Sequence, residues 1–126
     1  RTLPLVALVA SFAERNMKRV FEAWHGVIGA EPPRLLFVGN SYFYYSDSLH
    51  NHVRRLAIAS DPGLEKKMQY KSATIGGAEL SHHAIEYLTK PGQIGVKEPF
   101  QLVILQGGSG EPLSETRRAK FRETVI

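Results

Sequence analysis

Three short apolar runs, each followed by small polar residues or glycines, organise this chain. We predict a β-strand at each run, at 35–39, 68–75 and 100–105. The first and third runs are continuously apolar, which is typical of strands buried on both faces, whereas the second alternates. The three runs stop at Gly39-Asn40-Ser41, at Gly76-Gly77 and at the QGGSGE segment of residues 106–111.

Segments with helical periodicity separate the runs. We predict helices over 47–60, 78–89 and 113–126, with Asp61-Pro62-Gly63 and Pro91-Gly92 ending the first two. Residues 41–46, SYFYYS, are predicted to be a polar-aromatic loop. The order strand, helix, strand, helix, strand, helix predicts an α/β protein. The expected architecture is a three-layer α/β/α fold around a mostly parallel sheet.

Residues 1–33 admit two interpretations. Apolar residues recur at helical spacing from Leu5 to Trp24, which favours an amphipathic helix. The alternative is a secretory signal, with a basic start, an apolar run and Ser11-Phe12-Ala13 as a small-residue exit. Gly26 and the pair Pro32-Pro33 then mark a linker, so the organised domain is expected to span 34–126.

Composition narrows the possible functions. The 126 residues have ordinary apolar content, and no run approaches the roughly 18 apolar residues of a membrane span. The chain has no cysteine, which excludes disulfides and thiolate metal sites. The net charge of +4 is scattered in pairs between acids, so we predict no nucleic-acid partner. We also predict no cofactor and no metal, because the adjacent His82 and His83 point to different helix faces. Location and oligomeric state stay open.

The three polar breaks are expected to share one edge of the sheet, because parallel strands bring their carboxyl ends together. Ser41 there offers a hydroxyl for nucleophilic catalysis, and the backbone N–H groups of Ser41 and Gly77 are candidate oxyanion donors. The side chain of Gln106 or Ser109 would add a further donor. The alternative is structural: Asn40 and Ser41 cap the next helix, and Gly76-Gly77 is only a turn.

The three blocks resemble those of the SGNH (GDSL-like) hydrolases. Gly39-Asn40-Ser41, Gly76-Gly77 and the residues 103–111 occur in that family's order and spacing, over roughly residues 34–126. The resemblance implies an SGNH/flavodoxin-like α/β/α fold and an esterase, lipase or carbohydrate deacetylase. It implies that Ser41 is the nucleophile and an oxyanion donor, and that Gly77 is the second donor.

The sequence departs from the family pattern at two points. Gly110 stands where the family's third block has its oxyanion asparagine, which is why Gln106 or Ser109 is considered instead. The family's late Asp-x-x-His block does not occur before Ile126. We therefore expect the domain to be incomplete at its C-terminus, and this chain alone to be nearly inactive.

The prediction is a serine ester hydrolase acting on a small ester or an acylated carbohydrate. Asn40, Tyr42, Tyr44 and His83 are the expected substrate-binding residues, because they surround Ser41 or follow Gly77. The alternatives are a non-catalytic binding module of the same fold and a nucleotide- or flavin-binding sheet. A phosphate cradle is disfavoured, because the chain has no G-x-x-x-x-G-K-[ST] motif and a glutamate follows the glycines at 107–110.

Overall fold

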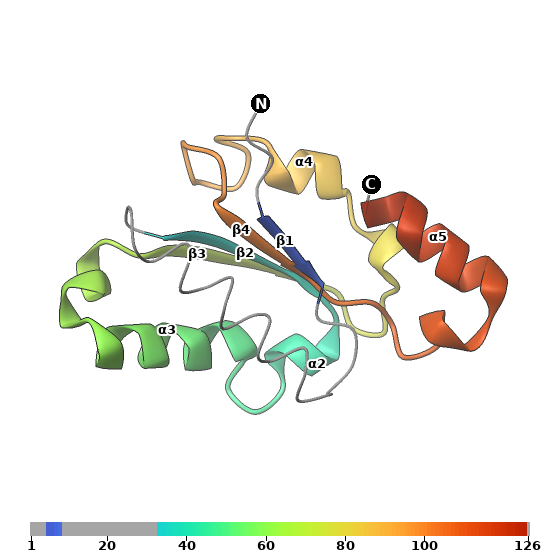
Figure 1. Cartoon of the computed structure of the whole chain (residues 1–126), viewed down its shortest axis with the longest axis horizontal. Helices are drawn as coiled ribbons and strands as arrows, with labels where there is room; N and C mark the ends of the chain where they lie inside the picture. Colours follow the sequence, from blue (N-terminus) through green and yellow to red (C-terminus); the bar gives the residue numbers. More distant parts are fainter. Residues whose placement is uncertain (1–4, 9–32, 126) are drawn as a thin grey trace.

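A parallel sheet forms the centre of the computed structural model, which describes residues 5–8 and 33–125 (Figure 1). The strands stand in the order β1-β4-β2-β3, and every pair is parallel. The predicted α/β class and parallel sheet are therefore confirmed. Three of the strands fall on the three predicted runs. The bounds are Leu5–Leu8 for β1, Arg34–Gly39 for β2, Gln69–Thr74 for β3 and Leu102–Leu105 for β4.

Four α-helices and three 3₁₀-helices follow the strands in the described part of the chain. The two long helices agree with the predicted segments to within two residues. No helix among the described residues is long and apolar enough to cross a membrane. The bounds are Ser41–Tyr44 for α2, Leu49–Ser60 for α3, Ile85–Thr89 for α4, Glu115–Val125 for α5, Pro62–Lys66 for η1, Leu80–His82 for η2 and Glu111–Leu113 for η3.

The helix predicted over 78–89 is wrong as a single element. It is divided into η2 and α4, because His83 between them has extended backbone angles (φ −94°, ψ 140°). The His83 ring turns inward and forms a hydrogen bond of 2.8 Å with the Gly39 carbonyl. The expected loop at 41–46 also differs, since its first four residues form α2.

The N-terminal helix is wrong at Leu5–Leu8, which is strand β1. These residues pair in register with β4, from Leu5 opposite Leu102 to Leu8 opposite Leu105. Parallel pairing thus outweighs the helical spacing of the apolar residues there. The rest of the expected helix and the signal-like alternative lie outside the described residues.

Successive residues of β2 point to opposite faces of the sheet. Leu35 and Phe37 join a cluster with residues of α3 and η1, and Leu36 and Val38 join a second cluster with residues of η2, α4 and α5. Figure 1 shows α3 on one side of the sheet and α4 on the other. All four β2 side chains are fully buried, which explains why the run carries no polar residue.

The order in which the chain adds strands to the sheet reverses at β2, although all the strands run parallel. From β2 the chain passes through α3 to β3 on one side, and then through α4 to β4 on the other side. In open α/β sheets, ligands bind beyond the carboxyl ends of the strands at such a reversal. The residues after Gly39 and after Leu105 therefore lie where this fold most readily forms a site.

Candidate active site

Asn40 ties together the three loops that follow β2, β3 and β4. Its side-chain amide donates hydrogen bonds to the carbonyls of Ala78, at 3.1 Å, and Gly107, at 3.3 Å. Its side-chain oxygen accepts from the backbone N–H of Tyr42 at 3.1 Å and caps α2. The residue is 3% exposed. Because Ser41 and Gly77 are the chain neighbours of Asn40 and Ala78, these bonds hold the two predicted oxyanion donors at one edge of the sheet.

Gln106, the residue after β4, connects the end of β4 to the end of β2 at the same edge of the sheet. Its side-chain oxygen accepts the backbone N–H of Asn40 at 3.2 Å, and its own N–H donates to the Val38 carbonyl at 2.8 Å. The close fit requires a glycine at position 39. A Cβ there would lie 2.6 Å from the Gln106 Oε1 and 2.7 Å from the ring of Phe43. Gly39 therefore serves close packing, and its φ is not in the left-handed region.

Ser41 is the first residue of α2 and is half-buried. Its carbonyl accepts the N–H of Tyr45 at 3.0 Å. Within the described residues, its hydroxyl and its backbone N–H form no hydrogen bond. An N–H at the first helical position has no intrahelical acceptor, so it is available to an oxygen approaching from outside.

Gly77 lies in the loop that faces α2. Its φ of +70° is in the left-handed region, and a Cβ built on it would meet no atom within 4 Å. The neighbouring Gly76 approaches α2 closely, since its Cβ would lie 3.1 Å from the Tyr44 hydroxyl oxygen. The left-handed backbone explains the glycine, and the residue is exposed.

Glu111 is a site residue that the sequence reasoning did not identify. Its carboxylate is 4% exposed and accepts the backbone N–H groups of Leu80, at 3.3 Å, and Gly108. These bonds attach the loop after β4 to η2. The same oxygen explains Gly107, whose Cβ would lie 2.6 Å from it. The sequence signal for this role is a glutamate directly after a glycine-rich run, which by itself indicates only a charge that repels anions.

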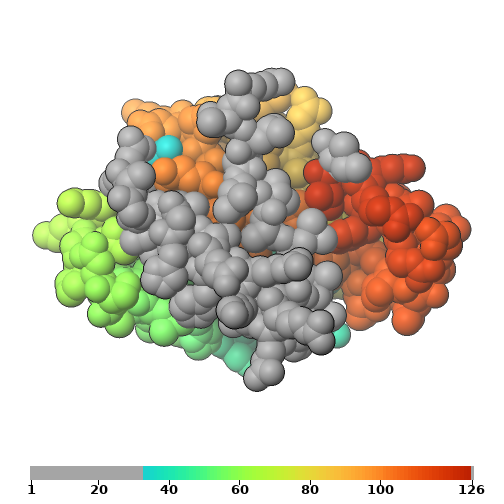
Figure 2. All heavy atoms as spheres, in the orientation of Figure 1, coloured from blue at the N-terminus to red at the C-terminus, as the bar shows by residue number. Residues whose placement is uncertain are grey.

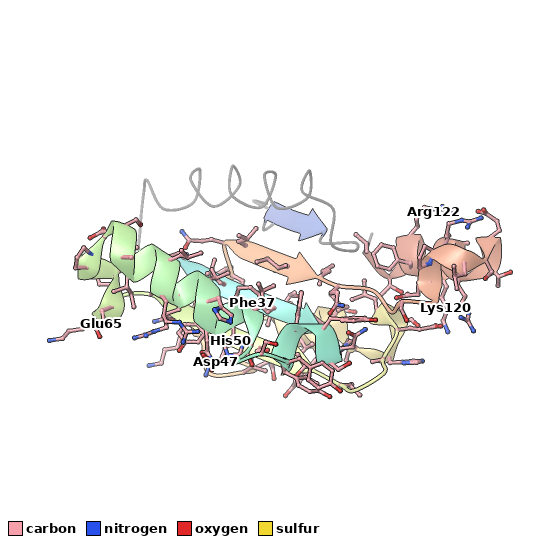
Figure 3. The ribbon with its side chains drawn as sticks, turned by 90° about the horizontal axis from the view of Figure 1, so that it is seen from below. Phe37, Asp47, His50, Glu65, Lys120 and Arg122 are labelled. Atoms are coloured by element: carbon pink, nitrogen blue, oxygen red, sulfur yellow. The ribbon has the colours of Figure 1, made fainter. Side chains whose placement is uncertain are left out.

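None of the histidines in the described segments hydrogen-bonds Ser41. His82 accepts the backbone N–H of Glu79, and His52 contacts the Ser46 carbonyl. His50 lies on the α3 side of the sheet, with ring centroids 6.1 Å from Phe37 and 5.6 Å from Tyr70 (Figure 3). Burial lowers the pKa of His50, and the nearby Asp47 opposes that shift only in part. No three potential metal ligands converge in the part of the chain described.

A pocket of about 400 Å³ opens beside the Ser41 loop, between the loop after β4 and α5. Tyr42 and Gln106 form its side nearest Ser41, and Phe121 lies on its α5 side. Figure 2 shows α5 at one end of the molecule, away from α3. The full lining is Tyr42, Gln106, Gly107, Gly108, Ser109, Glu111, Pro112, Arg118, Phe121 and Arg122.

The predicted substrate-binding residues divide into two groups. Tyr42 and Tyr44 are exposed, at 48% and 41%, and Tyr42 lines the pocket. Asn40 and His83 are buried, and their described hydrogen bonds all go to the chain itself. The structure thus gives Asn40 and His83 positioning contacts, whereas Tyr42 and Tyr44 present exposed side chains at the surface. Of the two candidates for the additional donor, Gln106 is buried and fixed, whereas Ser109 is exposed at the pocket.

Comparisons with protein-family models, with curated proteins and with solved structures give no match for this chain.

Proposed function

We propose that this chain carries the nucleophile and oxyanion site of a serine ester hydrolase. Ser41 attacks the ester carbonyl, and the backbone N–H groups of Ser41 and Gly77 stabilise the tetrahedral oxyanion. Gln106 supplies the third donor through its side-chain NH₂, since its oxygen already accepts from Asn40. We also propose that the fold has three layers. The sheet would lie between α3, which packs on one face, and α4 and α5, which pack on the other.

One observation carries the proposal: the hydrogen bonds from Asn40 to the Ala78 and Gly107 carbonyls. They bring the loops of Ser41, Gly77 and Gln106 together at the reversal point of the sheet. A capping role alone accounts for the bond between Asn40 and Tyr42, but it requires neither of the two bridging bonds.

The proposed reaction needs a general base to take the Ser41 proton, and no described histidine forms a hydrogen bond with Ser41. We therefore expect slow hydrolysis of 4-nitrophenyl acetate by this chain, and acceleration when imidazole is added as an external base. Imidazole also hydrolyses this ester in solution, so the informative quantity is the rate difference between the wild type and Ser41→Ala.

Ser72→Ala is the matched control, because it removes an exposed serine hydroxyl from β3. The proposal predicts that Ser41→Ala abolishes the protein-dependent rate and that Ser72→Ala leaves it unchanged. Equal imidazole-dependent rates for the wild type and Ser41→Ala would exclude Ser41 as the nucleophile. The alternative, a non-catalytic binding module with the same fold, would then be favoured.

A further inference from the structure

The pocket beside Ser41 combines an apolar interior with positive charge at its α5 side. Tyr42, Pro112 and Phe121 provide apolar surface, and Arg118 and Arg122 line the pocket from α5. Its volume of about 400 Å³ lies within the usual range for small-molecule sites. The lining therefore suits a molecule with an apolar body and an anionic end.

The two arginines differ in how fully they are already bonded. Arg118 donates to the Pro112 carbonyl at 2.6 Å and to Glu115 through two nitrogens, at 3.2 and 2.7 Å. Arg122 donates to Glu115 through Nη2 alone, at 2.8 Å. In the described part of the chain, the other two nitrogens of Arg122 have no acceptor. Arg122 is therefore the group that remains able to bind an anion.

The charge balance of this cluster also favours an anion. Glu115 is the single carboxylate shared by both guanidinium groups, and their hydrogen bonds lower its pKa, so it stays ionised. The cluster of Glu115, Arg118 and Arg122 therefore carries one excess positive charge at the α5 side of the pocket, while Glu111 contributes one negative charge to the lining away from this cluster. Glu111, the acid that lines the pocket, directs its carboxylate to the backbone N–H groups of Leu80 and Gly108.

We propose that this pocket binds an apolar carboxylate, with the carboxylate at Arg122 and the apolar body against Tyr42 and Phe121. Tyr42 is the chain neighbour of Ser41, so a group in the pocket lies beside the reacting ester. If the chain is the proposed ester hydrolase, its substrate is then an ester with one apolar half that ends in a carboxylate. This assignment rests on the proposed function.

The test is a titration of ¹⁵N-labelled protein with 4-phenylbutyrate and with its neutral isostere 4-phenylbutyramide. We expect the acid to shift the amide signals of Gly107, Gly108 and Ser109. We also expect it to bind about three- to fivefold more tightly than the neutral amide, the range for an exposed ion pair. The preference is expected to decrease at high salt.

Arg122→Gln is expected to remove the preference for the acid. Lys120→Gln removes the same charge from α5 at a residue that does not line the pocket, and Figure 3 shows Lys120 and Arg122 on opposite sides of the helix. It is expected to keep the preference. Equal affinity for acid and amide, shifts confined to other residues, or an equal loss in both variants would overturn the inference.

The titration measures binding without turnover, so it separates the two proposals. A protein whose imidazole-dependent rate equals that of Ser41→Ala, but that still prefers the acid, would refute the hydrolase function alone. An active protein that binds acid and amide equally would refute only the assignment of this substrate class.

Discussion

Replacing Asn40 by alanine is the perturbation that probes the assembly of the site most directly. The variant loses three buried or half-buried hydrogen bonds, to the Ala78 carbonyl, the Gly107 carbonyl and the Tyr42 N–H. The two bonds to carbonyls contribute about 1 kcal/mol each, and the capping bond contributes about 1 kcal/mol. We therefore expect the free energy of unfolding to decrease by about 3 kcal/mol, which a domain of this size tolerates.

A second variant separates capping from bridging. In Asn40→Ser the hydroxyl caps α2 but cannot reach both carbonyls, so the variant is expected to recover about 1 kcal/mol relative to Asn40→Ala. Asn51→Ala is the matched control. Asn51 donates to the carbonyl of Asp47 on the exposed side of α3, and its loss is expected to cost less than about 1 kcal/mol.

Urea unfolding followed by circular dichroism measures all three variants. A decrease below about 1 kcal/mol for Asn40→Ala would refute the reasoning. The loops would then be held together by contacts other than those of Asn40. Equal stabilities of Asn40→Ala and Asn40→Ser would show that capping of α2 by the side chain at position 40 does not contribute to stability.

Three further predictions concern residues around the sheet. Gly39→Ala places a methyl group 2.7 Å from the Phe43 ring and is expected to destabilise the fold by about 2–3 kcal/mol in urea unfolding; a change below about 0.5 kcal/mol would contradict the packing argument. His50→Phe removes a buried ring nitrogen that has no hydrogen-bond partner among the residues described, so it is expected to stabilise the protein by about 1 kcal/mol at pH 7. Because burial lowers the pKa of His50, the unfolded state binds the proton more tightly than the folded state. The free energy of unfolding of the wild type is therefore expected to fall as the pH decreases below about 6.5. The same decrease in His50→Phe would show that another group causes this pH dependence. Glu111→Ala leaves the N–H groups of Leu80 and Gly108 without their acceptor and is expected to cost about 2–3 kcal/mol and to speed amide exchange at both residues; unchanged exchange would contradict the bridging role.

The sequence predicts β2 and β4 well because burial on both faces leaves a clear signal. The run Leu35-Leu36-Phe37-Val38 carries no polar residue, and its side chains are fully buried in the structure. The convergence of the loops after β2 and β4 also follows from the strand order, since parallel strands end at one edge.

The division of the predicted helix at 78–89 could not be read from local pattern. It depends on the contact between His83 and the Gly39 carbonyl, 44 residues away in the chain. The strand at Leu5–Leu8 is a similar case, because its apolar spacing fits a helix and only pairing with β4 selects the strand. Contacts of this range override local periodicity.

Within the site, the sequence identified the loops but not the roles of all their residues. Asn40 and His83 were expected to bind substrate, yet their described bonds position the backbone. Glu111 and the residues of α5 that line the pocket were not identified, because their importance arises from packing between distant segments. The role of Ser41 stays a prediction.

Labelling with a fluorophosphonate in the presence of imidazole tests the central claim most directly. Peptide mapping by mass spectrometry then locates the phosphonylated residue. The account predicts modification at Ser41, its loss in Ser41→Ala and its retention in Ser72→Ala. Modification at another serine, or equal labelling of the wild type and Ser41→Ala, would contradict the claim that Ser41 is the nucleophile.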